Sequence, residues 1–277
     1  MDELKELCLC SHGAVSRIDV IWGILGKDIA RYGRAVATML RPGADGDQTR
    51  LYGCFAARKL LEAGCIGILG RIDPSRLLIL REYQIRSDYA FGERHPAALD
   101  WRTDVVSAEK AKWSEGVAPS KFVRSLLGGH LGEVYWLDAI RSIGNVASQV
   151  NADALDRATW VVEILDHHDR AAREAAAQAG ADPTAAVVEL AVLNTIRTRT
   201  QQTFSKLSKG VHLEFVVDQD AIFDNETIKA TMRDAVKVLT QIAFFSHLID
   251  SAHSALDLTV ALNLAASVEA GIENHVS

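Results

Sequence analysis

The clearest pattern of hydrophobic and polar positions lies near the end of the chain, between residues 225 and 269. This stretch contains no Pro and no Gly. Its apolar residues recur at helical spacing, at Ile242, Phe245, Ile249, Ala252 and Leu256. Polar residues follow on a neighbouring stripe, at His247, Asp250, His253, Ser254 and Asp257. The pattern predicts one long amphipathic helix around which the other helices pack.

The same spacing predicts helices over most of the remaining chain. We expect them at residues 2–40, in one or two pieces, and at 48–70, 75–88, 120–149, 152–179 and 184–208. Asp47 and Asp224 are positioned to cap the helices that follow them. Alternation between residues 212 and 223 indicates a short strand or an extended loop. The chain is therefore predicted to be an all-α bundle of about seven to nine helices with a long C-terminal central helix.

Glycine and proline positions divide this bundle. An irregular connecting segment at 89–119 separates an N-terminal helical lobe, residues 1–88, from a C-terminal helical bundle, residues 120–277, and we expect both to share a core. Small residues within 48–70, including Gly53 and Gly64, predict that neighbouring helices approach closely there.

Composition narrows the functional classes. The net charge of −6 argues against nucleic-acid binding through a basic field over the whole protein, although a local basic patch remains possible. The four cysteines have no zinc-site spacing and predict buried free thiols in a reducing cytoplasm. No apolar window approaches the ~18 residues of a membrane span, so we expect no membrane partner. Phosphate-binding and dinucleotide-binding glycine motifs are also missing, and no cofactor is expected.

One set of candidate residues combines histidines and carboxylates. On a continuous helix, His247 and Asp250 would share a face with His253 and Asp257 and could form half of a metal site. The other half would come from His167, His168 and Asp169, whose His-Asp doublet resembles the ligand order of metal-dependent HD phosphohydrolases. The alternative is that these polar side chains only form hydrogen bonds across helix–helix seams.

A second set of candidates lies around residues 203–214, TFSKLSKGVHLE. This run resembles a segment of HEPN-type helical proteins from bacterial defence and toxin systems. Members with ribonuclease activity carry an Arg, four to six residues and then a His, and the fit in this chain is Arg124 to His130. The glycine pair before His130 would weaken the helix that holds these two residues in register.

The resemblance implies a metal-independent ribonuclease, or a member that binds RNA or a protein partner, acting as a homodimer. Arg124 would then stabilise charge on the phosphate, and His130 would act near the 2′-hydroxyl, with His212 as a further catalytic candidate. A basic cluster could hold the RNA backbone through Arg197, Arg199, Lys206 and Lys209. Alternatively, the two lysines only complement the helix dipole, and the protein is a scaffold without chemistry.

Overall fold

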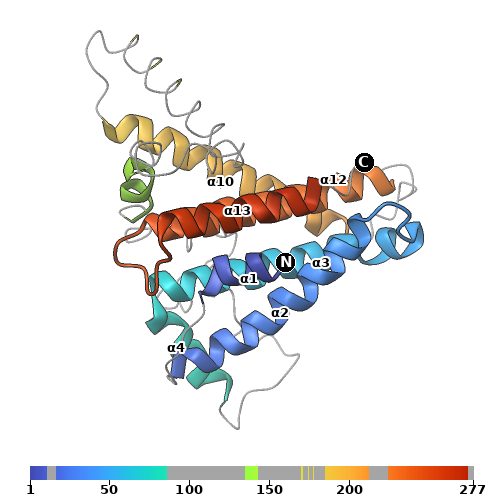
Figure 1. Ribbon diagram of the computed structural model, residues 1–277, viewed down its shortest axis with the longest axis horizontal. Coiled ribbons are helices and arrows are strands. Elements are labelled where there is room, and N and C mark those ends of the chain that lie inside the picture. The colour runs from blue at the N-terminus through green and yellow to red at the C-terminus, as the bar shows by residue number, and fades with distance from the viewer. Residues whose placement is uncertain are drawn as a thin grey trace, which may run out of the picture.

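The computed structural model describes residues 1–10, 17–85, 135–142, 170, 174, 177, 185–211 and 224–273. Within these ranges the chain is helical and contains no strand (Figure 1). The α-helices are α1 (Asp2–Leu9), α2 (Arg17–Leu40), α3 (Gly46–Ile72), α4 (Pro74–Gln84), α10 (Ala185–Lys209), α12 (Asn225–Phe245) and α13 (Leu258–Glu273). Residues 135–142 are helical as well. The predicted all-α bundle is confirmed.

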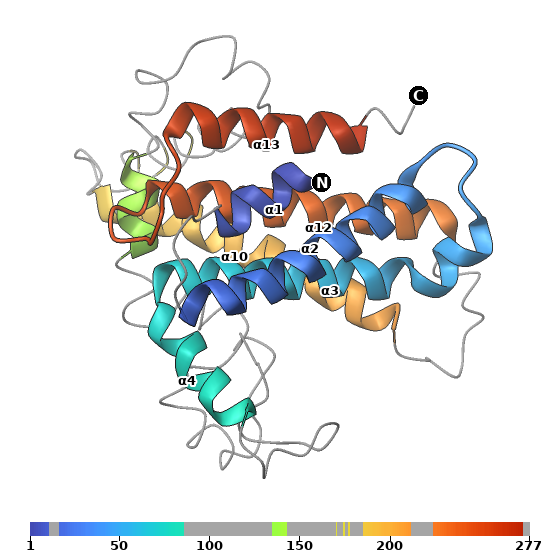
Figure 2. The same cartoon turned by 60° about the horizontal axis from the view of Figure 1, so that its bottom comes forward.

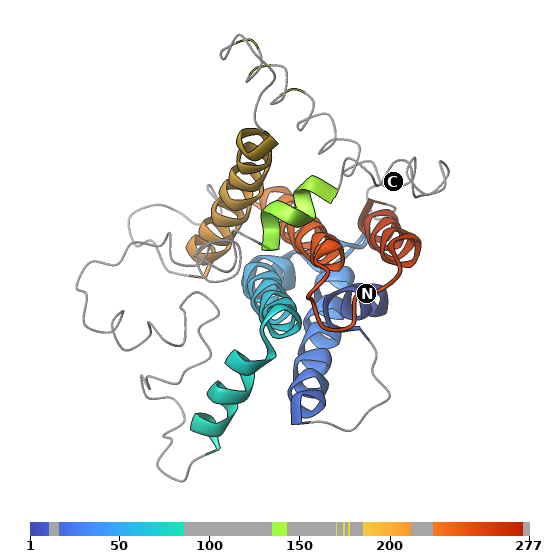
Figure 3. The same cartoon turned by 90° about the vertical axis from the view of Figure 1, so that its left-hand side faces the viewer.

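Helix α3 lies in the middle of the bundle. It packs most extensively against α2 and α12, and also contacts α1, α4 and α10. Seen from the end of the bundle, α10 and α2 lie on opposite sides of α3 (Figure 3). One hydrophobic core runs through all of these helices, from Leu4 in α1 to Ile272 in α13. The N-terminal and C-terminal parts of the chain therefore share a single core.

The prediction of one continuous helix at 225–269 is wrong. Helix α12 ends at Phe245, a short 3-10 turn follows at Ser246–Leu248, and α13 begins only at Leu258. Helix α13 then turns back alongside α12 (Figure 2). Ser254 in the connection has a φ of 54°, which no α-helix contains. Apolar residues recur at the same spacing through the connection, so periodicity could not reveal the reversal.

Most other helix limits agree with the sequence to within a few residues. The N-terminal stretch forms two pieces, α1 and α2, and Asp224 caps α12 by accepting a hydrogen bond from the Thr227 backbone N–H at 2.6 Å. The cap of α3 is a correction: Asp45, not Asp47, accepts the hydrogen bonds of the first turn. The ranges predicted at 120–149, 152–179 and 212–223 lie largely outside the described residues.

The small residues of α3 permit close helix packing, as predicted. A Cβ at Gly53 would lie 2.7 Å from Ile228 Cγ2 and 2.9 Å from Met232 Sδ, both on α12. A Cβ at Gly64 would lie 2.5 Å from both Leu239 Cδ atoms. Because real Cβ atoms do not approach other atoms this closely, glycine sets the distance between α3 and α12.

We expect Gly53→Ala to destabilise the protein by about 1–2 kcal/mol. Overpacking against Ile228 costs more than the roughly 0.5–1 kcal/mol that alanine adds to helix stability. Gly23→Ala in α2 is the matched control, because a Cβ there meets nothing within 4 Å. That change should stabilise the protein by about 0.5–1 kcal/mol. Urea unfolding of both variants measures the difference, and equal effects of the two changes would contradict the packing argument.

Two further expectations concern the cysteines and the membrane. Cys8, Cys10, Cys54 and Cys65 are all buried and none forms a disulfide, as predicted. Among the described helices, none is both long and apolar enough to cross a bilayer.

Candidate functional site

The described part of the chain contains only some of the predicted site residues. Those outside it are Arg124, His130, His212, His167, His168 and Asp169. Those within it are the four cations of α10, together with His247 and Asp250. The described features that bear on function are the surfaces of α10, α2 and α3 and the surroundings of His247.

Helix α10 presents positive charge on its outer face. Arg199, Lys206 and Lys209 are exposed, and no described carboxylate pairs with them. We call these three residues the α10 cation face. Arg199 and Lys206 are seven residues apart and so lie on the same side of the helix. Arg197 is only half-exposed, and its Nη1 donates to Asn194 Oδ1 at 3.2 Å. No acidic residue occurs between residues 190 and 211.

The opposite face of α10 fixes this orientation. Leu193, Ile196 and Leu207 are buried in the core, with Thr200 and Thr203 between them. The Thr200 hydroxyl donates to the Ile196 carbonyl at 2.7 Å, so this polar group is satisfied within the helix. Burial of these residues leaves the cations on the solvent side.

A second group of exposed cations lies on α2, where the sequence interpretation assigned no role. Lys27, Arg31 and Arg34 are exposed and spaced four and three residues apart, which places them on one face. We call them the α2 cation row. Arg31 is 70% exposed, and its Nη1 lies 4.0 Å from Asp28 Oδ1. The signal that could have identified the row is this spacing on the polar side of an amphipathic helix.

Helix α3 exposes three large apolar side chains in a single turn. Leu51 is 71% exposed, Tyr52 57% and Phe55 42%. Phe55 makes an edge contact with Tyr32 of α2, with ring centroids 6.2 Å apart. We call Leu51, Tyr52 and Phe55 the α3 apolar patch. Hydrophobic periodicity did not identify it, because apolar residues occur on both the buried and the exposed sides of α3.

His247 belongs to a buried cluster centred on Arg71, which is fully buried. Arg71 Nη1 donates to Ser246 Oγ at 2.7 Å and to the Leu7 carbonyl at 3.4 Å. Its Nε donates to the His253 carbonyl at 3.2 Å, and its Nη2 donates to His247 Nδ1 at 2.9 Å. One side chain thus joins α1, the end of α3 and the connection between α12 and α13.

The hydrogen bonds around His247 require a neutral ring. Its Nε2 lies 2.9 Å from the Leu7 carbonyl and must donate, while Nδ1 accepts from the Leu256 N–H at 3.1 Å as well as from Arg71. Burial and then the adjacent Arg71 charge lower the pKa of His247 to about 3, although the Leu7 carbonyl acts in the opposite direction. The ring is therefore uncharged at neutral pH.

No carboxylate among the described residues balances the Arg71 charge. Backbone carbonyls do so instead, since Leu7 lies near the C-terminal end of α1 and Arg71 itself lies near that of α3. Helix C-termini carry partial negative charge, which favours a cation there. Burial raises the pKa values of the Cys8 and Cys10 thiols, an effect that Arg71 partly offsets. The cluster is a buried hydrogen-bonding network that joins α1, α3 and the connection between α12 and α13.

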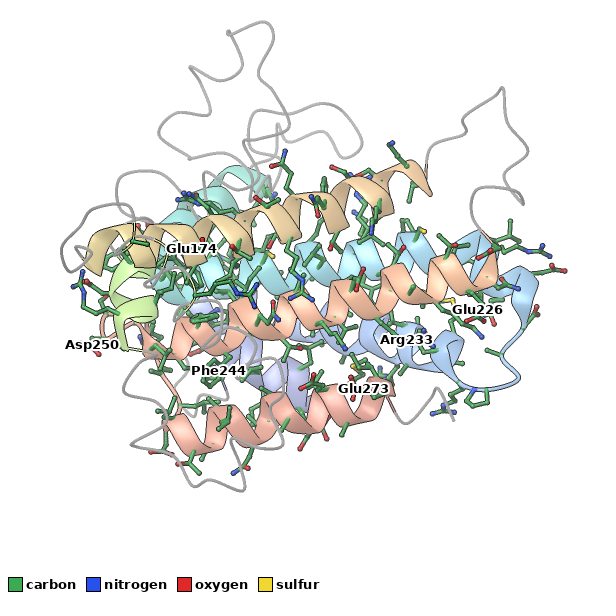
Figure 4. All side chains as sticks on the ribbon, turned by 90° about the horizontal axis from the view of Figure 1, so that it is seen from above. Glu174, Glu226, Arg233, Phe244, Asp250 and Glu273 are labelled. Atoms are coloured by element: carbon green, nitrogen blue, oxygen red, sulfur yellow. The ribbon has the colours of Figure 1, made fainter. Side chains whose placement is uncertain are left out.

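The predicted polar stripe is dispersed in the structure. His247 is buried, whereas Asp250 is exposed at the end of the bundle where α12 ends (Figure 4). His253 stacks on Trp22, with centroids 5.3 Å apart, and Asp257 caps α13 by accepting from the Thr259 N–H at 2.9 Å. The prediction that these residues share one helix face is wrong, because the helix reverses between them. Among the described residues no three His, Cys, Asp or Glu side chains are arranged to hold a metal ion.

Comparison with known proteins found no similar protein. No protein-family model, curated protein sequence or solved structure matches the chain.

Proposed function

We propose that the protein binds RNA through the α10 cation face and the α2 cation row. The observation that carries the proposal is the α10 cation face: three exposed cations with no described carboxylate partner, on a helix segment without acidic residues, in a chain of net charge −6. A surface that concentrates positive charge against the net charge of its protein favours a polyanionic ligand.

The residues around these cations support RNA as that ligand. Thr198, Gln202 and Ser205 are exposed on the same side of α10. Hydroxyl and amide side chains beside Arg and Lys commonly contact phosphate and sugar oxygens, which position a nucleic acid without reading its sequence. The HEPN resemblance, which is carried partly by the same segment of α10, implies the same class of ligand.

The catalytic form of the proposal rests on the resemblance. Arg124 would stabilise negative charge on the phosphate, and His130, with His212, would handle the proton of the 2′-hydroxyl without a metal ion. The resemblance also implies a homodimer, for which the mass in solution is the direct measurement. The metallohydrolase alternative has less support, because both ring nitrogens of His247 are already hydrogen-bonded beside a buried cation.

The test is the salt dependence of binding to a fluorescently labelled RNA, measured by anisotropy. We expect a variant with Arg199, Lys206 and Lys209 all changed to Gln to bind at least about tenfold more weakly. The slope of log K against log salt should fall by about 2, since each phosphate contact contributes roughly 0.7 for a single strand. A variant with Lys27, Arg31 and Arg34 all changed to Gln should likewise bind RNA more weakly and show a smaller salt slope.

The matched control changes Lys5, Arg141 and Arg170 to Gln. These three cations are also exposed, but they are scattered over the described surface. If both triple variants bind like this control, or if the unchanged protein does not bind RNA, the proposal fails. The same RNA, run on a denaturing gel in the presence of EDTA, reports cleavage. Cleavage by the unchanged protein that is lost in Arg124→Ala and His130→Ala would support the catalytic form.

A further inference from the structure

We propose that the ligand is single-stranded RNA and that unpaired bases stack on Tyr52 and Phe55 of the α3 apolar patch. This inference rests on the proposed function and adds the substrate class. It also explains why two aromatic side chains are exposed, which binding by charge alone does not require.

The two rings lie on one continuous surface. Tyr52 and Phe55 are three residues apart on α3, so their side chains are neighbours, and Leu51 lies one turn before Phe55. Tyr52 is 57% exposed and Phe55 42%. The edge contact with Tyr32 holds Phe55 from the α2 side at an interplanar angle of 80°. A ring held on a helix and supported by a second ring offers a fixed platform for stacking.

This platform lies between the two cation-bearing helices. Phe55 touches α2 through Tyr32, and one turn further along α3 the Arg58 guanidinium lies 4.9 Å over the Phe204 ring of α10. The end view in Figure 3 shows α3 between α10 and α2. A strand that crosses between the cations of α10 and those of α2 over α3 would pass next to the aromatic rings.

The charges nearest the patch are already matched. Asp47 pairs with Arg50, and Glu62 pairs with both Arg58 and Lys59. The patch itself therefore repels a phosphate backbone only weakly, while the cations of α2 and α10 attract it. Aromatic rings flanked by positive charge are the combination that binds single strands, because every unpaired base has a π-face.

The aromatic surface also selects between forms of RNA. In a duplex the base faces are stacked on one another and only phosphates, sugars and base edges are accessible. The cations of α10 and α2 can contact either form, but Tyr52 and Phe55 can stack only on bases that are not paired. Preference for single strands is thus the property that the patch adds.

The experiment compares a labelled single strand with a duplex of the same sequence. We expect Phe55→Leu and Tyr52→Leu each to weaken single-strand binding by about fivefold to 150-fold, which corresponds to the roughly 1–3 kcal/mol lost with one stacked base. The salt slope should stay unchanged, because no charge is removed. Duplex binding should change by less than about twofold. The Leu substitutions keep most of the apolar volume of the side chain. Phe55→Trp keeps an aromatic face and should bind the single strand like the unchanged protein.

Leu51→Ala is the matched control, since Leu51 is the most exposed member of the patch but has no π-face. It should leave single-strand affinity within about twofold. If the Tyr52 and Phe55 variants bind the single strand like the unchanged protein, while the α10 triple variant is still defective, this inference fails and the proposed function stands. If Phe55→Leu instead lowers the molecular mass by light scattering, the patch joins copies of the chain, and the stacking proposal is overturned.

Discussion

Replacing Arg71 with Met is expected to destabilise the protein by about 3 kcal/mol. Arg71 is fully buried and donates to the Leu7 and His253 carbonyls, to Ser246 Oγ and to His247 Nδ1. Met fills similar volume but donates no hydrogen bond. A buried polar group that loses its partner costs about 1–3 kcal/mol, and several groups lose a donor here.

Two effects of Arg71→Met on the free energy of unfolding oppose each other, so the direction of the measured change shows which of them is larger. Burial penalises the charged guanidinium and lowers the Arg71 pKa, so removing the charge relieves a desolvation cost. We expect the lost hydrogen bonds to outweigh that relief, because three of the acceptors, the Leu7 carbonyl, Ser246 Oγ and His247 Nδ1, are bonded to Arg71 in the buried interior. The His253 carbonyl lies in the connection between α12 and α13. Without the Arg71 side chain this connection loses the side-chain hydrogen bond to α3 and keeps the backbone bond from the His253 N–H to the residue 71 carbonyl, at 2.7 Å.

Arg31→Met is the matched control, because it removes the same functional group from a side chain that is 70% exposed. Its cost should stay below about 0.5 kcal/mol. Urea unfolding measures both variants, and hydrogen exchange of the amides between residues 249 and 257 reports the connection directly. Equal stability of the two variants would show that the cluster contributes no net stability.

The second large effect is the dependence of the free energy of unfolding on pH. His247 has a folded-state pKa of about 3, whereas an unfolded histidine titrates near 6.5. Between these values the unfolded chain binds a proton that the folded protein does not. Stability therefore decreases as the pH falls below about 6.5, by up to about 1.4 kcal/mol per unit. From pH 6.5 to 4.5 this single group should remove about 2–3 kcal/mol of the free energy of unfolding.

His247→Gln tests this dependence, because Gln can donate to the Leu7 carbonyl and accept from the Leu256 N–H but cannot be protonated. The variant should be less stable at pH 7 and should lose less stability on acidification. The measured quantity is the difference between variant and unchanged protein at each pH, so that titrating carboxylates cancel. His253→Gln, at an exposed position, is the control. Parallel pH profiles for His247→Gln and the unchanged protein would contradict the assignment.

Local sequence signals accounted for much of the fold. The span of α3 and the cap of α12 follow from apolar spacing and from short polar residues at helix starts, which act over a few residues, whereas the sequence left open whether residues 2–40 form one helix or two. The glycines of α3 likewise indicated close packing before any partner was known. For the candidate site, the sequence singled out the α10 cations, three of which are exposed.

The reversal after Phe245 could not be predicted in this way. Residues 246–257 continue the helical spacing, and the hydrogen bonds that stabilise the turn come from Arg71, 175 positions from Ser246. The same long-range contacts place His247 in the core and leave Asp250 outside it. No local pattern distinguishes a buried histidine from an exposed one on the same stretch of chain.

The exposure of the α3 apolar patch could not be predicted from the sequence either. Leu51, Tyr52 and Phe55 look like core residues in the sequence, and only the placement of α2 and α10 leaves them exposed. The sequence by itself determined the helices, because hydrophobic spacing and capping depend on neighbouring residues. The tertiary structure alone decided which polar groups are desolvated and which apolar groups face water, because burial depends on contacts between segments far apart in the chain.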